Sequence, residues 1–136
     1  MKDQSRAKDS LRLRLACGDT GFSPALTRRA PAHVIVTDLP YGIQHAPRET
    51  DRKPESFQSL LRRVLPVWIQ CLKPGGAVAL SFNELTLPAG EVLSCLQDAG
   101  FHPVRDSLFS DLRHEVEQAV SRNVVFATKK KEDNIP

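Results

Sequence analysis

Hydrophobic and polar residues alternate in the first part of the chain. In LRLRLACGD, residues 11–19, leucines alternate with arginines, and this period of two predicts a half-buried strand. A short helix is expected next, because Ser23 precedes Pro24 at a first helical position and Pro31 ends the segment. The apolar run AHVIVTD, residues 32–38, then predicts a strand buried on both faces, as in the centre of a parallel sheet.

The remainder of the chain shows helical spacing and then strand spacing. A stripe typical of a long helix is formed by Phe57, Leu60, Leu61, Val64, Leu65, Trp68 and Leu72. AVALSF, residues 77–82, predicts a strand, and LPAGEVLSCLQDAG, residues 87–100, predicts a helix closed by its last glycine. FHPVRDSLF and SRNVVFATKK predict two final strands, and the segment between them fits either a short helix or a long hairpin loop.

Strands and helices alternate along this order, which favours an α/β fold. We expect a mostly parallel, Rossmann-like sheet with helices on both faces and a C-terminal antiparallel hairpin. In such sheets ligands bind at the carboxyl ends of the strands, where Gly18-Asp19 and residues 38–42 both fall. One domain is expected over residues 11–129, with disordered segments at 1–10 and 130–136.

Composition and charge narrow the class of protein. With 40% hydrophobic and 26% charged residues the chain resembles an ordinary globular protein, and it has neither a membrane-spanning run nor a secretory signal, so a cytoplasmic location is expected. Cys17, Cys71 and Cys95 are widely spaced and odd in number, which favours packing roles over disulfides or a metal site. The net charge of +3 permits contact with a nucleic acid without requiring it.

The turn after the second predicted strand carries the candidate chemistry. The Asp38 carboxylate can accept hydrogen bonds from an amino group, and the Leu39 carbonyl, held by Pro40, offers a second acceptor. Tyr41 provides a flat face on which a base can stack. Acceptors beside a ring suit the exocyclic amine of a nucleobase turned out of its stack. The alternatives are a polar turn or backbone cap for Asp38 and an ordinary rim aromatic for Tyr41.

These four residues resemble the [DNS]-P-P-[YFW] motif of S-adenosylmethionine-dependent amino-methyltransferases. The longer VTDLPYG, residues 36–42, is similar to the THUMP-type RNA guanine-N2 methyltransferases. The resemblance implies a class I methyltransferase fold, S-adenosylmethionine as cofactor, no metal, and RNA, in particular tRNA during its processing, as partner. By position it gives catalytic roles to Asp38, Leu39, Pro40 and Tyr41, which would hold the amine and the base.

Binding roles are expected at four further positions, Asn83 by its place at a strand end. Gly18 and Asp19 would approach the adenine of the cofactor, although Gly-Asp also makes ordinary turns. Gly42, within the motif, and Asn83, at the end of the AVALSF strand, would line the substrate pocket. Basic residues could contact phosphates or form a solvated face, namely Arg48, Arg52, Lys53, Arg62 and Arg63.

Two features depart from the family pattern. Leu39 replaces the first proline of the common motif, and the seven glycines form no G-x-G turn for the cofactor. By this comparison the chain begins at the third strand of the fold, so an exposed apolar sheet edge and face are expected. Three other possibilities stay open: an adenine-N6 enzyme acting on DNA or RNA, an inactive fragment that serves as a binding partner, and a second chain that completes the sheet.

Overall fold

The computed structural model describes residues 13–40, 55–105, 114–115 and 121–132. The 3-10 turn η1 (Thr20–Phe22) leads into α1 (Ser23–Thr27), which is followed by β1 (Ala32–Asp38), α2 (Phe57–Cys71), β2 (Leu72–Asn83) and α3 (Ala89–Asp98). The last elements are β3 (Phe101–Pro103), β4 (His114–Glu115) and β5 (Ser121–Lys129). Both longer helices and the strands that follow them lie where the hydrophobic spacing predicted.

The strands form one sheet in the order β1-β2-β5-β3, with β4 paired to β5. β1 and β2 are parallel, with Asp38 opposite Ser81. β5 runs antiparallel to β2, β3 and β4. The C-terminal antiparallel pairing is therefore confirmed, but the prediction of a mostly parallel sheet is wrong for the described strands, among which β1–β2 is the one parallel pair. The wider class, a mixed α/β sheet with helices, is the observed one.

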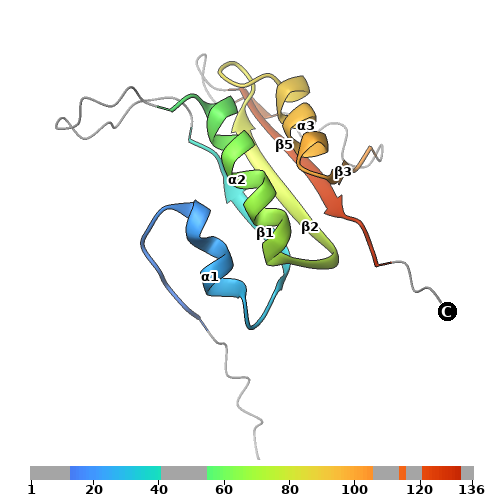
Figure 1. The fold of residues 1–136 in the computed structure, drawn as a ribbon. Coiled ribbons are helices and arrows are strands. Elements are labelled where there is room, and N and C mark those ends of the chain that lie inside the picture. Colours follow the sequence, from blue (N-terminus) through green and yellow to red (C-terminus); the bar gives the residue numbers. More distant parts are fainter. Residues whose placement is uncertain (1–12, 41–54, 106–113, 116–120, 133–136) are drawn as a thin grey trace, which may run out of the picture.

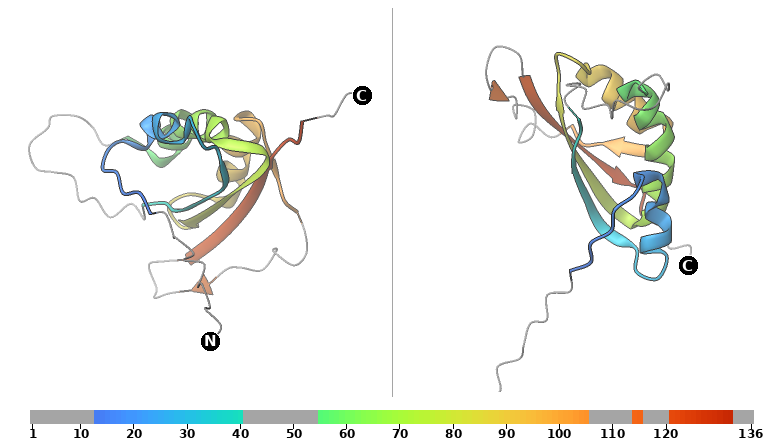
Figure 2. Two further views of the ribbon diagram at one scale, coloured as in Figure 1. Left: turned by 90° about the horizontal axis from the view of Figure 1, so that it is seen from below. Right: turned by 90° about the vertical axis from the view of Figure 1, so that its left-hand side faces the viewer.

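All the described helices cover the same face of this sheet (Figure 2). Side chains of β2 point alternately toward the helices and away from them. Those that point toward the helices, Val78, Leu80 and Phe82, are buried. They join one hydrophobic cluster with the buried stripe of α2 and with Val92 and Leu96 of α3; the members from α2 are Leu61, Val64, Leu65 and Trp68. The expectation of helices on both faces is thus not met in the part of the chain that the structure describes.

The turn from α2 into β2 depends on glycine. Gly75 adopts a positive φ of 74°, which side chains disfavour. At Gly76 a Cβ atom would lie 2.9 Å from the Lys73 carbonyl oxygen and 3.0 Å from that of His33, so backbone packs directly against backbone. The Lys129 ammonium donates to the Ile69 and Leu72 carbonyl oxygens at the end of α2, at 2.9 Å and 2.8 Å.

The N-terminal part departs most from the sequence-based expectation. Residues 13–17 form no strand, and the Leu13 and Leu15 side chains are 74% and 89% exposed. β1, predicted as a central strand, lies at the edge of the sheet (Figure 1).

Cys71 and Cys95 are buried as expected, but Cys17 is exposed. None of the helices in the described ranges has the length and apolar character to cross a membrane.

Candidate functional site at the carboxyl end of strand β1

Asp38 and Leu39 are held at the carboxyl end of β1 by pairing with β2. The Leu39 amide donates to the Ser81 carbonyl oxygen at 2.8 Å, which extends the ladder one residue past the strand. The Leu39 side chain is buried in the core, whereas the Asp38 side chain is 54% exposed. The backbone is therefore fixed while the carboxylate can reach a ligand. Pro40 is the next residue of the turn, and the predicted contacts Tyr41 and Gly42 lie outside the described residues.

Arg122 faces Asp38 from the start of β5. Its Nη2 atom lies 3.9 Å from Asp38 Oδ2, a loose ion pair between two half-exposed side chains. Because β5 is antiparallel to β2, its first residues meet the same edge at which β1 and β2 end, and Arg122 lies opposite Asn83. Sequence reasoning missed Arg122, since only the pairing of β5 with β2 brings it to this edge.

Asn83 is a buried residue at the same edge, and its side chain binds two backbone segments there. It is 3% exposed, and its Oδ1 accepts hydrogen bonds from the Leu85 amide at 3.2 Å and the Ser121 amide at 3.1 Å. These bonds join the loop after β2 to the start of β5. Asn83 therefore lies at the predicted edge, with its carbonyl oxygen engaged by backbone donors; the substrate contact expected of it stays a prediction.

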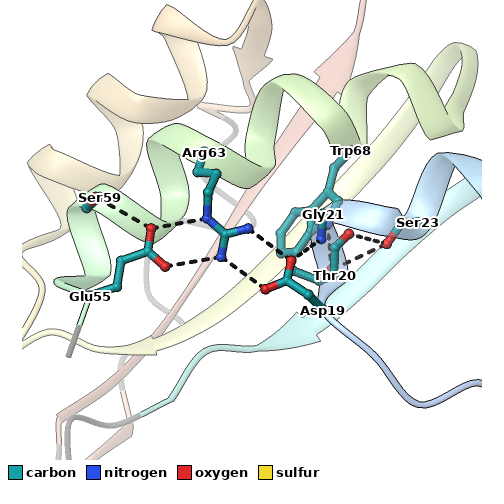
Figure 3. A network of polar contacts seen from close by, with 8 residues as sticks. All are labelled: Asp19, Thr20, Gly21, Ser23, Glu55, Ser59, Arg63 and Trp68. Atoms are coloured by element: carbon teal, nitrogen blue, oxygen red, sulfur yellow. Dashed lines mark hydrogen bonds and ion pairs between the residues drawn. The ribbon is translucent and has the colours of Figure 1, made fainter. Parts of the chain in front are cut away.

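Asp19 belongs to a different network, drawn in Figure 3. Its carboxylate caps η1 by accepting from the Gly21 amide at 2.7 Å, and it receives Nη1 and Nη2 of Arg63 at 2.9 Å and 3.3 Å. The same guanidinium donates to Glu55, from Nε to Oε1 and from Nη2 to Oε2, each at 3.1 Å. Arg63, which we considered as a phosphate contact, thus bridges two carboxylates and fixes η1 against α2.

This network shifts the titration of its members. Hydrogen bonding from Arg63, assisted by the Gly21 amide, lowers the pKa of Asp19 below its ordinary 3.8. Hydrogen bonding from Arg63 likewise lowers the pKa of Glu55 below 4.5, and the two acids raise the pKa of Arg63. All three groups are therefore charged at neutral pH.

Trp68 makes a second link between α2 and the N-terminal segment. Its indole Nε1 donates to Thr20 Oγ1 at 2.8 Å, and the Ser23 hydroxyl donates to the Thr20 carbonyl oxygen at 2.6 Å. A cavity of about 310 Å³ lies beside this contact, between α1, α2 and β1. Gly18, two residues upstream of Thr20, has open space where a side chain would project, so packing does not demand a glycine there.

The predicted site residues thus fall into two groups. Asp38, Leu39 and Asn83 meet at the carboxyl edge of β1 and β2. Asp19 lies at η1 with its carboxylate bound to α2 and to its own turn, and Gly18 precedes it. The expected adenine contact is already occupied by a guanidinium and an amide.

The residues that the structure describes do not form a complete site for S-adenosylmethionine by themselves. Three N–H groups already donate to the Asp19 carboxylate, and among the described glycines none lies in a G-x-G turn that could receive the cofactor. The cavity beside β1 also lacks the acids and amides that such a ligand requires, since its lining is formed by hydroxyl, apolar and thiol side chains of Thr20, Ser23, Leu26, Thr27, Ala32, Ile35, Val36, Thr37, Trp68 and Cys71. Nor do three His, Cys, Asp or Glu side chains gather as a metal site would need within the described ranges.

Comparison with solved structures identifies the fold. The chain is similar to TTHA0409 of Thermus thermophilus, a protein provisionally described as a DNA modification methylase, with a TM-score of 0.53 and 18% identity over 88% of this chain and 53% of the other. A second structure of that protein, in complex with S-adenosyl-L-methionine, gives a TM-score of 0.52 and 15% identity over 88% and 56%. The chain therefore spans about half the length of these neighbours and shares their fold over that half. No family model matches the sequence, and no curated protein does.

Proposed function

We propose that this chain carries the base-binding half of a methyltransferase that acts on an exocyclic amine of a nucleobase. The observation that carries the proposal is the placement of the Asp38 carboxylate and the Leu39 backbone at the carboxyl end of β1, in a fold shared with a methylase. Ligands of open α/β sheets bind at this end of the strands. The Asp-Leu-Pro-Tyr sequence of the turn matches the need for two acceptors and a stacking ring.

The proposed role of these residues is to orient the target amine. The Asp38 carboxylate would accept one N–H of the amine and the Leu39 carbonyl the other, while Tyr41 would stack on the base. Fixing both N–H groups sets the direction of the nitrogen lone pair, and such positioning is a large contribution to a displacement reaction. S-adenosylmethionine is the proposed methyl donor, to be held in the complete site by residues beyond those described.

Arg122 would influence how Asp38 receives the amine. At 3.9 Å the ion pair between the guanidinium and the carboxylate is loose, so an incoming amine could compete for the carboxylate. A freed guanidinium at this edge could then meet a phosphate of the same nucleotide. The exposed position of both side chains is consistent with this exchange.

Two substrates are proposed for the same turn. The VTDLPYG sequence favours guanine N2 in RNA, particularly tRNA. The neighbour's description as a DNA modification methylase favours a second candidate, adenine N6 in DNA. Both amines offer two N–H donors, so Asp38 and Leu39 serve either one.

A binding assay and a transfer assay test the proposal. Unmodified tRNA and duplex DNA are each incubated with the protein and radiolabelled S-adenosylmethionine, and nucleic-acid affinity is measured in parallel. Asp38→Ala should abolish transfer, whereas Asp98→Ala, which removes another exposed acid at the far end of α3, should leave transfer unchanged. Equal transfer by Asp38→Ala and the unaltered chain would contradict the assignment of the amine-binding site.

An inactive fragment that acts only as a binding partner is the competing function, and the occupied Asp19 carboxylate favours it. Calorimetric titration of S-adenosylmethionine into the chain separates the two. Micromolar binding weakened by Asp19→Ala would show a cofactor site in the chain alone. No heat at millimolar cofactor would show that the chain needs another component for any transfer.

A further inference from the structure

Three chain segments meet at the end of the sheet opposite Asp38. They are the loop from α1 into β1, the turn from α2 into β2, and the end of β5, which lie at the same end of the molecule (Figures 1 and 2). β1 begins at Ala32, opposite Leu72, and the Gly75 amide of the turn donates to the Lys130 carbonyl oxygen at 3.3 Å. Backbone pairing therefore holds the three segments side by side.

These segments carry an excess of positive charge. Over residues 28–33, 72–76 and 128–132 the sequence has one acid, Glu132, against six basic residues, which we call the basic end: Arg28, Arg29, Lys73, Lys129, Lys130 and Lys131. All of them are exposed except Lys129, which is partly buried. Like charges gathered in this way create a positive potential that attracts an anionic partner.

Two of the ammonium groups in the basic end are held in place. Lys73 Nζ lies 3.0 Å from His33 Nε2, and because an ammonium group can only donate, the imidazole accepts through this nitrogen. The contact positions the charge of Lys73 without neutralising it. The aliphatic part of Lys131 lies across Gly75, where an added Cβ atom would be 3.1 Å from Lys131 Cγ. Side chains that are already ordered lose less conformational entropy when they bind a ligand.

The distribution of charge suits an extended polyanion. The basic residues are spread over three segments along the end of the sheet, whereas a small anion needs them at one point. Neither the turn at residues 72–76 nor the end of β5 has a large exposed apolar side chain, which insertion into a lipid surface would use. A nucleic acid presents regularly spaced phosphates, and lysine and arginine bind these without regard to sequence.

We propose that the basic end binds the phosphate backbone of a nucleic acid whose target base reaches Asp38. The choice of a nucleic acid as partner rests on the proposed function, whereas the excess of charge does not. β1 advances about 3.3 Å per residue, so its six steps from Ala32 to Asp38 span about 20 Å. A duplex rises about 3.4 Å per base pair, so the phosphates bound by the basic end lie about six nucleotides from the target. The basic end thus holds the substrate at a distance from the reacting amine.

Salt-dependent binding tests the proposal. The affinity of the full chain for a fluorescein-labelled tRNA transcript and for a labelled DNA duplex is measured by anisotropy over a range of salt concentrations. Lys73→Gln and Lys131→Gln should each lower the slope of log affinity against log salt by about 1. The double variant should bind about tenfold more weakly at low salt. Lys73→Arg and Lys131→Arg keep the charge and should bind as the unaltered chain does.

Arg105→Gln is the matched control. Arg105 is exposed and also contributes one charge, but it follows β3, which runs away from the basic end as it passes from Phe101, opposite Lys129, to Pro103, opposite Ala127. Its affinity and salt slope should therefore stay unchanged. Glutamine keeps most of the aliphatic stem of lysine, so the packing of Lys131 on Gly75 is retained in the test variants.

The basic end and the proposed function can fail separately. Lysine-dependent binding without any methyl transfer would support the basic end alone. Methyl transfer and affinity that are both unchanged in the double lysine variant would overturn the basic end and leave the proposed function standing. An equal loss of affinity in Arg105→Gln, or no binding of either nucleic acid by the unaltered chain, would also overturn it. So would attachment to phosphatidylglycerol vesicles in place of both nucleic acids, because the partner would then be a membrane surface.

Discussion

Arg63 binds Asp19 across 44 residues of sequence, with Nη1 2.9 Å from Oδ1 and Nη2 3.3 Å from Oδ2. This pair fastens the N-terminal segment to the second turn of α2. Because the same guanidinium also holds Glu55, loss of Arg63 would release η1 and the start of α2 together. The packing of the N-terminal part therefore depends on a charged contact at the surface.

The Arg63 network should make stability depend on pH in the acid range. The folded-state pKa values of Asp19 and Glu55 lie below 3.8 and 4.5, so the stabilisation is complete above these values and is lost as pH falls through the lowered ones. Urea midpoints of the unaltered chain and of Arg63→Gln should differ at pH 6 and converge toward pH 3. The control is Arg62→Gln, whose partner Asp98 lies 3.5 Å away. A difference that stays constant across this range would contradict the account.

Thr20 should report the docking of α1 through the chain's single tryptophan. Thr20→Val removes the acceptor of the Trp68 indole N–H, and loss of such a hydrogen bond costs about 1 kcal/mol. We expect red-shifted tryptophan emission and lower stability. Thr27→Val changes another cavity-lining threonine, whose hydroxyl donates to the Ser23 carbonyl oxygen within α1 at 3.2 Å, and the emission of this variant should stay unchanged. Identical spectra for both variants would rule out the proposed link.

Gly76 should tolerate no side chain. In Gly76→Ala the new methyl would meet two backbone oxygens at 2.9 Å and 3.0 Å, and overpacking of this kind costs about 1–3 kcal/mol. Gly90→Ala is the matched control, because open space surrounds that position in α3, and helix propensity should make it neutral or stabilising by up to about 1 kcal/mol. Denaturant unfolding of both variants measures the contrast, and equal midpoints would refute it.

Asn83 should contribute to stability even without substrate. Asn83→Ala leaves the Leu85 and Ser121 amides, which are only partly buried, without this acceptor, and loss of each hydrogen bond costs about 1 kcal/mol. Asn123→Ala serves as control. The Asn123 side chain donates from Nδ2 to Glu84 Oε2 at 3.4 Å, and its Oδ1 accepts from the backbone amide of Val124, the next residue of the same strand. Thermal unfolding should show the larger loss for Asn83→Ala. Comparable losses would mean that Asn83 does not organise the sheet edge.

Hydrophobic periodicity correctly predicted the elements whose apolar face packs against another element of the chain. The α2 stripe and the β2 alternation succeed because each has a matching apolar surface within the chain, as with Leu61 and Val78. The same reasoning failed for residues 13–17 and for the central position of β1. Leucines at every second residue favour a strand with one buried face. The partner strand that would bury this face is not among the described elements.

Local patterns placed Asp38 at the end of a strand, where β1 does end. The strand expected before Gly18-Asp19 is not among the described elements, and the roles of these residues stay predictions. The attachment of Asp19 to Arg63 and the approach of Arg122 to Asp38 depend on how distant elements pack, spanning 44 residues in the first case. Long-range pairing of this kind leaves no short-range signature.

The central position of β5 sets the order in which the sheet can form. β5 lies between β2 and β3 and also carries β4, yet its residues, Ser121–Lys129, are the last of all the described strands to be synthesised. A ribosome that has released only the first hundred residues exposes β1, β2 and both longer helices, with the far edge of β2 still open. The pairing of β5 with β2, β3 and β4 therefore begins only after residue 129 has left the exit tunnel, and chains truncated before β5 cannot form this sheet.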